Sequence, residues 1–153
     1  MLNDMPTHHQ GTKDEVRALD AFIKLVRCVE SVTTRTHLHL DAAGITPRQF
    51  GVLEALFHLG PLYQRDIARK LLKSEGNVTL VIDNLEKLGL VERQRSETDR
   101  RYFSVCLTEE GRRLMGDVFP RHVEAIVAEM SVLTPAEQEE LGRLCRKLGK
   151  REA

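Results

Sequence analysis

The stretch LGLVERQRSETDRRYFSVCLTEEG, at residues 88–111, contains a helix end, two short strands, a charged turn and a new helix start. Residues 90–91 and then 102–105 are short runs rich in β-branched or aromatic side chains, namely Val91, Tyr102, Phe103 and Val105, which is typical of strands. Residues 96–101 between them are polar and include two adjacent arginines. The stretch therefore predicts a β-hairpin that carries arginines at its tip.

A polar helix is predicted directly before this hairpin. Ser74 is a suitable N-cap for it and Gly89 a suitable C-terminal stop. Its inner, apolar face is formed at helical spacing by Val78, Val81, Ile82 and Leu85. A helix of this kind fits a major groove, and arginines on a hairpin reach phosphates or the adjacent minor groove. The pattern predicts a winged helix-turn-helix, with the two helices within residues 62–89.

The hairpin also resembles one protein family. In the MarR family of bacterial transcription regulators, the wing reads Asp-x-Arg, five residues, Leu-Thr, two residues, Gly, and here the same pattern starts at Asp99 and ends at Gly111. The resemblance implies a mainly α fold in a single domain, residues 1–153, with a β-hairpin wing. It places the winged helix-turn-helix lobe at residues 46–107 and dimerisation helices at 14–43 and 108–150.

Further helices are predicted from caps and apolar spacing. Thr46 and Thr134 each begin a capping box with proline at the first helical position, and Thr108 caps a long helix that contains Pro120, a potential kink. The first helix is predicted to begin at Asp14, and it can run on through His37 to Asp41 before Gly44 stops it. The helix after Thr46 is expected to bury its apolar residues, which are Phe50, Val52, Leu53, Leu56 and Phe57.

Composition limits the possible functions. The 153 residues carry 23 basic and 23 acidic side chains, so no global field attracts a polyanion and any DNA-binding surface must segregate its charge locally. No stretch has the length of a membrane span and the N-terminus lacks a secretory signal, so we expect a cytoplasmic protein. Cys28, Cys106 and Cys145 lack metal-ligand spacing, and we expect them to be small buried apolar residues.

Candidate DNA-binding residues lie on the polar helix, the wing and the neighbouring helices. Asn and Thr side chains can read base edges, and Asn pairs well with adenine, although a polar helix face can also be merely solvated. The family resemblance implies that Arg101 enters the minor groove and that Asp99 orients it. The base-edge candidates are Asn77, Thr79, Leu80 and Asn84; the backbone candidates are Arg48, Arg65, Arg69, Lys73, Ser74, Arg93, Arg95 and Arg100.

A ligand site is predicted around the junction of the first two helices, where the family resemblance implies a small aromatic acid or phenol. The candidate residues are His37, His39, Phe50 and Phe57. The alternative is that both phenylalanines belong to the core and both histidines are exposed or cap a helix.

These features predict a sequence-specific transcription regulator that binds double-stranded DNA. We expect a ligand-responsive repressor that acts as a homodimer on a pseudo-palindromic operator. The alternative is a winged-helix module that binds proteins without contacting DNA. The sequence has no nucleophile elbow, phosphate-binding glycine loop or paired metal-ligand motif, so we expect no enzyme activity, no cofactor and no metal.

Overall fold

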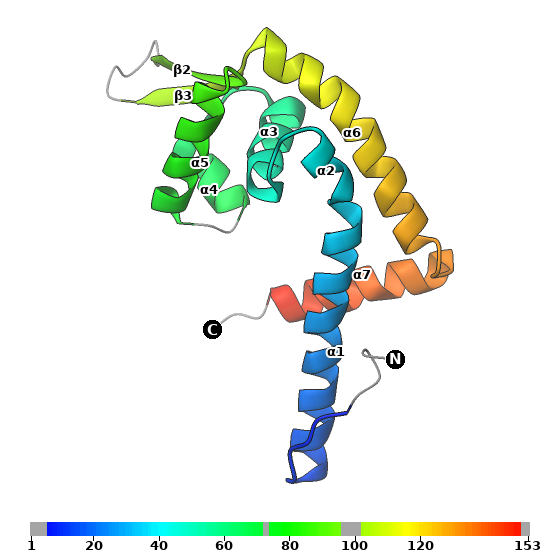
Figure 1. Ribbon diagram of the computed structural model, residues 1–153. Coiled ribbons are helices and arrows are strands. Elements are labelled where there is room, and N and C mark those ends of the chain that lie inside the picture. Colours follow the sequence, from blue (N-terminus) through cyan, green and yellow to red (C-terminus); the bar gives the residue numbers. More distant parts are fainter. Residues whose placement is uncertain (1–5, 72–73, 96–101, 151–153) are drawn as a thin grey trace. The chain divides into compact units, whose positions relative to one another are not determined.

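Figure 1 shows the protein as a computed structural model, which describes residues 6–71, 74–95 and 102–150. The fold is mainly helical with one small antiparallel sheet, as predicted. The chain forms two compact units: residues 37–123, here called the lobe, and residues 1–36 with 124–153, here called the terminal unit. One helix, α6 (Glu109–Met130), contributes residues to both units.

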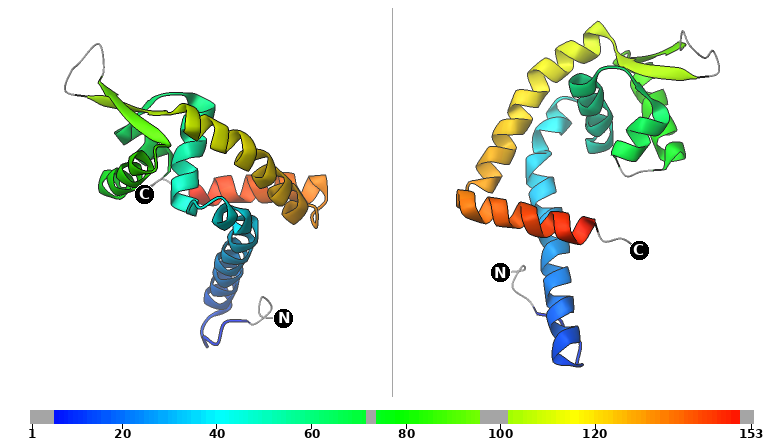
Figure 2. Two further views of the ribbon diagram at one scale, coloured as in Figure 1. Left: turned by 45° about the horizontal axis from the view of Figure 1, so that its top comes forward. Right: turned by 180° about the vertical axis from the view of Figure 1, so that it is seen from behind.

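The lobe contains the winged helix-turn-helix. Two helices, α4 and α5, form the helix-turn-helix, and two strands, β2 and β3, form the hairpin that follows α5. Both views in Figure 2 show α3, α4 and α5 grouped next to this hairpin. The elements of the lobe before α6 are α2 (Leu38–Ala42), α3 (Pro47–Leu59), β1 (Leu62–Tyr63), α4 (Gln64–Lys70), α5 (Glu75–Lys87), β2 (Val91–Arg95) and β3 (Phe103–Leu107).

The sheet has three strands in the order β1-β3-β2, all antiparallel. Leu62 of β1 pairs with Val105 of β3. In the hairpin, Val91 of β2 pairs with Leu107 of β3 at the end near the helices, and Arg95 pairs with Phe103 at the opposite end. The two hairpin strands are confirmed, whereas β1 was not predicted. Two residues carry no periodic signal, and β1 is a strand only because β3 supplies its hydrogen-bonding partner.

The core of the lobe is closed within one chain. Apolar side chains from α3, α4, α5, both wing strands and α6 are at most 2% exposed, among them Leu53, Ile67, Ile82, Leu85, Val91, Val105 and Met115. Phe57 was predicted to be buried on α3, and this prediction is wrong. Its side chain is 36% exposed near the end of the helix. It follows Leu56 on a face that the core does not cover.

The predicted capping boxes are confirmed. The Thr46 amide donates to Gln49 Oε1 at 2.8 Å, and the Gln49 amide donates to Thr46 Oγ1 at 3.2 Å. Thr134 and Glu137 repeat the arrangement at the start of α7 (Pro135–Gly149). Each box satisfies two amide groups that a helix start otherwise leaves without an intrahelical acceptor, which fixes where the helix begins.

The first helix ends earlier than predicted. α1 spans Lys13–Thr36, and α2 starts anew at Leu38 after His37. The Leu40 amide donates to the His37 carbonyl at 2.9 Å. This hydrogen bond spans three residues, as in a 3₁₀ turn, and not the four residues of an α-helix. Leu40 is completely buried in the lobe, and this tertiary placement sets the break where Thr36, His37 and His39 have only low helix propensity.

A tight junction joins the end of α5 to the start of α6. The Thr108 hydroxyl donates to the Gly89 carbonyl at 2.6 Å and accepts from the Gly111 amide at 3.1 Å. A Cβ atom on Gly111 would lie 2.1 Å from the Leu90 carbonyl oxygen, so only glycine fits there. The spacing Leu-Thr-x-x-Gly at the end of the quoted stretch is therefore explained by packing.

The terminal unit contains α1, the last part of α6 and α7, and it buries very little. Thr36 is the buried residue of α1, and α7 has none. Arg35 of α1 and Glu129 of α6 form an ion pair in this unit, and their hydrogen bond lowers the pKa of Glu129. No helix of the described residues is long and apolar enough to span a membrane.

The cysteines differ from the prediction at two of three positions. Cys106 is buried on β3, and burial raises the pKa of its thiol, which disfavours the reactive thiolate. Cys28 and Cys145 are exposed, contrary to expectation. They lie on α1 and α7, whose surfaces a single chain leaves largely uncovered.

Candidate nucleic-acid interface

The outer face of α5 presents the side chains predicted to read bases. Asn77, Leu80 and Asn84 are exposed and spaced by three and four residues, so they lie along one side of the helix. Leu80 is 65% exposed although it is apolar. The Ser74 hydroxyl accepts from the Asn77 amide at 3.4 Å and caps the helix. The free face therefore combines two amides with one apolar side chain, a set that can contact base edges and thymine methyl groups.

Thr79 lies at the edge of this face and is half-buried. Its hydroxyl donates to the Glu75 carbonyl at 2.9 Å and accepts a hydrogen bond from the Gln64 side chain at the start of α4. Thr79 thus links the two helices of the helix-turn-helix. Gln64 was not singled out in the sequence, because nothing local indicates a partner fifteen residues away.

Arg93 of β2 fastens the wing to α5. Its guanidinium donates to Asp83 at 2.5 Å and to Glu86 at 2.6 Å. Partial burial lowers the pKa of Arg93, but the hydrogen bonds and charges of Asp83 and Glu86 outweigh this, and the pKa is raised overall. The single positive charge of Arg93 therefore offsets about half of the negative charge of these two carboxylates on α5, which reduces the repulsion that a phosphate backbone would meet there.

The predicted backbone contacts are distributed over several elements. Arg48 is exposed in the first turn of α3 and, with Asn77, lines a hollow of about 250 Å³. Arg65 and Arg69 are exposed on α4, at 3.9 and 3.8 Å from Asp66. Arg95 is exposed at the end of β2. Four predicted residues lie outside the described residues: Lys73, Asp99, Arg100 and Arg101.

Three of the four predicted ligand-site residues, His37, His39 and Phe50, lie around one further ring. This ring belongs to His122, which the sequence did not reveal as a site residue. His122 of α6 has its ring centroid 4.4 Å from that of Phe50, 5.2 Å from His39 and 5.9 Å from His37. Phe50 is 3% exposed and His122 is 7% exposed. Phe50 is thus a buried core residue, as the alternative in the sequence analysis predicted, and it also lies against the histidines of the predicted ligand site.

Phe57 belongs to a different group of rings. It packs against His58 at 5.3 Å and Phe119 at 6.0 Å, and it lines a hollow of about 160 Å³ that also includes Arg112. His58, Phe119 and His122 were missed because they become neighbours only when α3 and α6 pack together. The one available signal was the helical spacing of Phe119 and His122.

The described residues contain no group of three or more His, Cys, Asp or Glu side chains that could hold a metal ion.

Comparisons with known proteins agree with this geometry. The sequence profile of the MarR family matches residues 45–103. The chain is 35% identical over 133 residues to the HTH-type transcriptional regulator MhqR of Bacillus subtilis, covering 87% of this chain and 92% of MhqR. The crystal structure of AbsC, a MarR family transcriptional regulator from Streptomyces coelicolor, superposes with a TM-score of 0.83 at 23% identity, covering 93% of this chain and 97% of AbsC. The crystal structure of NadR in complex with 4-hydroxyphenylacetate gives a TM-score of 0.71 at 28% identity, with 97% of this chain and 100% of that chain covered.

Proposed function

Since this chain belongs to the MarR family of transcription regulators, we propose that it binds duplex DNA with α5 in the major groove and the wing beside it. The protein is a DNA-binding transcription regulator, and its relatives are regulators and not enzymes. The observation that supports this binding mode is the free face of α5, where Asn77, Leu80 and Asn84 are exposed next to the hairpin. We expect the protein to act in the cytoplasm and to have no catalytic activity.

The backbone contacts would surround this helix. Arg48, Arg65, Arg69, Lys73, Ser74, Arg95 and Arg100 are assigned to phosphates, and Arg101, oriented by Asp99, to the minor groove. Arg93 is better suited to hold the wing against α5, because its charge is already shared by Asp83 and Glu86. The neutral net charge of the chain means that these few cations must supply the attraction to DNA.

A homodimer is proposed because the terminal unit leaves its apolar side chains in water. Phe22 is 61% exposed and Leu148 is 62% exposed, and the other exposed apolar side chains of α1, α6 and α7 include Leu19, Val26, Val29, Ile126, Val127, Leu141 and Leu144. A second copy of the chain would bury this surface. Two lobes related by a two-fold axis would read a pseudo-palindrome whose half-sites lie about 34–36 Å apart, and a bound dimer would repress by excluding other proteins.

The effector is proposed to be a small aromatic acid or phenol. NadR, which is similar along nearly the whole chain, has been crystallised with 4-hydroxyphenylacetate. In this chain the group of His37, His39, Phe50 and His122 combines a flat apolar surface with imidazole nitrogens that can bind a carboxylate or a hydroxyl. Such a ligand releases DNA only if it binds the non-binding arrangement of the protein more tightly.

The DNA-binding proposal is tested by selecting bound sequences from random duplex DNA and measuring affinity at several salt concentrations. A specific regulator selects one motif and loses affinity steeply as salt rises. Arg101→Ala should weaken binding by about 1–3 kcal/mol and flatten the salt dependence. A folded protein that selects no motif and shows no salt dependence would favour the protein-binding alternative.

The dimer is tested with Phe22→Glu, which places a charge among the exposed apolar side chains of α1. Sedimentation should show a dimer for the wild type and a folded monomer for the variant. Glu139→Gln, an exposed polar change on α7, is the control and should remain dimeric. A wild-type chain that sediments as a monomer at micromolar concentration would refute the dimer.

The effector site is tested by titrating 4-hydroxyphenylacetate and related acids into the DNA complex. His37→Ala and His39→Ala should raise the concentration needed for release, whereas the exposed His58→Ala should not. Release that is unaffected by both substitutions would place the effector elsewhere.

A further inference from the structure

Two exposed aromatic residues stand at the start of β3, at the end of the hairpin strands that is farther from the helices. Tyr102 is 48% exposed and Phe103 is 43% exposed, so neither contributes to the closed core of the lobe. Tyr102 directly precedes β3, and Phe103 is the first residue of that strand. Their role must therefore be sought in what they touch on the surface.

Each of the two contacts an arginine from a different element. The Arg65 guanidinium carbon, on α4, lies 5.7 Å from the ring centroid of Tyr102 and 5.7 Å from that of Tyr63. The two tyrosine rings meet edge to face at 6.2 Å. The Arg95 guanidinium carbon, on β2, lies 5.7 Å from the ring of Phe103, its cross-strand partner. All three distances fall within the range of cation–π attraction.

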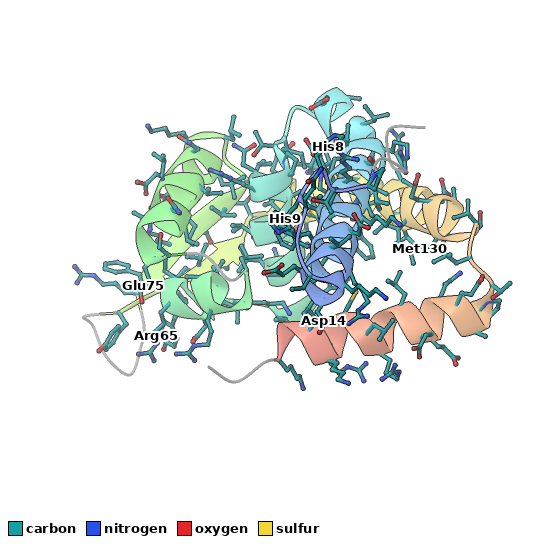
Figure 3. The ribbon with its side chains drawn as sticks, turned by 90° about the horizontal axis from the view of Figure 1, so that it is seen from below. His8, His9, Asp14, Arg65, Glu75 and Met130 are labelled. Atoms are coloured by element: carbon teal, nitrogen blue, oxygen red, sulfur yellow. The ribbon has the colours of Figure 1, made fainter. Side chains whose placement is uncertain are left out.

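The surroundings of Arg65 show why its position matters. Arg65 lines a hollow of about 410 Å³ together with Tyr63, Tyr102 and Glu75, and Figure 3 labels Arg65 and Glu75 on the same side of the molecule. Arg93 lines the same hollow, but its charge is shared by two carboxylates of α5. Asp66, at 3.9 Å, and Glu75, in the hollow, are carboxylates that can attract the Arg65 guanidinium, and contact with the two tyrosine rings competes with them.

We propose that Tyr102 and Phe103 are positioning residues that hold Arg65 and Arg95 ready to contact DNA phosphates. The proposal rests on the proposed function and extends it to two residues that touch arginines. A long arginine side chain loses rotamer freedom when it binds a phosphate. Contact with a ring removes part of that freedom before DNA arrives, so less is lost on binding.

Crossed double-mutant cycles on the full-length chain test this proposal, with affinity measured on the selected DNA motif. Tyr102→Leu should weaken binding about two- to fivefold in the wild-type background, which is the strength of an exposed cation–π contact, and should have no further effect in the Arg65→Ala background. Phe103→Leu should behave in the same way with Arg95→Ala. The crossed pairs, Tyr102→Leu with Arg95→Ala and Phe103→Leu with Arg65→Ala, should be additive.

Two further measurements separate positioning from a general effect on the wing. Tyr102→Phe keeps the ring and should keep wild-type affinity, whereas a loss would assign the role to the hydroxyl. Arg65→Ala should lower the slope of log affinity against log salt by about one, and Tyr102→Leu should lower it by a fraction of that. A merely structural change in the wing would weaken binding without this dependence on Arg65.

Tyr102→Leu could weaken DNA binding equally in the wild-type and Arg65→Ala backgrounds, in variants that unfold at the wild-type temperature. That result would overturn the positioning role and leave the DNA-binding function intact. A wild-type chain that binds no duplex would refute the function itself, and the positioning role with it.

Discussion

The lobe and the terminal unit use apolar residues in opposite ways. In the lobe, Leu53, Ile82 and Met115 are completely buried within one chain. In the terminal unit, α7 has a capping box and regularly spaced leucines but no buried residue. The lobe is therefore a closed structure, whereas the terminal unit exposes the kind of surface that one protein chain presents to another.

The largest expected difference between the units comes from removing one leucine side chain. Leu53→Ala should lower the free energy of unfolding by about 2–5 kcal/mol, because it leaves a cavity in a closed core. Chemical denaturation measures this change, and we expect it to be independent of protein concentration if the lobe unfolds separately.

The matched change in the terminal unit is Leu144→Ala, on a side chain that is 47% exposed in the single chain. On a free surface it would change stability by less than about 0.5 kcal/mol. In a symmetric dimer it removes two contacts, so the dissociation constant should rise about tenfold or more. An unchanged dissociation constant would exclude Leu144 from the interface.

Two glycines give the next contrast. Gly111→Ala in the lobe forces a Cβ atom against the Leu90 carbonyl and should lower the free energy of unfolding by about 1–3 kcal/mol. Gly142→Ala in α7 meets no atom within 4 Å in one chain, so it should raise helix stability by about 0.5–1 kcal/mol. Thermal unfolding distinguishes the two. A destabilised Gly142→Ala variant would show that a second chain packs closely against that position.

The two capping boxes allow a smaller test. Thr46→Ala and Thr134→Ala each remove an N-cap hydroxyl and should each cost about 1 kcal/mol. The loss at Thr46 should appear as lower stability of the lobe, whereas the loss at Thr134 should appear as weaker dimerisation. Equal effects of both changes on dimerisation would mean that the two units are not separable.

The smallest effect concerns acid. Hydrogen bonds lower the pKa of several carboxyl groups in the terminal unit below the usual 4.5, with the Arg35 side chain acting on Glu129 and the Thr134 amide acting on Glu137. A lowered pKa in the folded state means that the stabilisation is complete above about pH 4.5 and is lost as the pH falls through the lowered value. The helices of the terminal unit should therefore be less stable below that pH, and Glu137→Gln should reduce the pH dependence of their thermal unfolding measured by circular dichroism.

The sequence predicts what local chemistry determines. Thr46, Ser74 and Thr134 supply caps that act within three residues, and the apolar spacing of Val78, Ile82 and Leu85 identifies the buried side of α5. The hairpin follows from residue types that suit strands and turns. These features need no knowledge of distant residues. The caps, the buried side of α5 and the two hairpin strands are confirmed, whereas the predicted turn at residues 96–101 lies outside the described residues.

What the sequence does not predict depends on neighbours that are distant along the chain. The break at His37 follows from the burial of Leu40, and β1 exists because of β3. Arg93 has a charge that suits a phosphate contact, but the carboxylates of Asp83 and Glu86 lie within reach of it. His122 packs against His37 and His39, which lie more than eighty residues earlier in the chain, and no periodicity in the sequence indicates such a contact.

The strand order has a consequence for the way the protein is made. β3 is the middle strand of the sheet but the last of the three in the chain, so the sheet cannot form until residue 107 has left the ribosome. Until then the apolar sides of α3 and α5 lack the strand that helps to cover them, and they are open to chaperones or to misassociation. Cells that produce a truncated chain ending in the wing should therefore degrade it or accumulate it as aggregates.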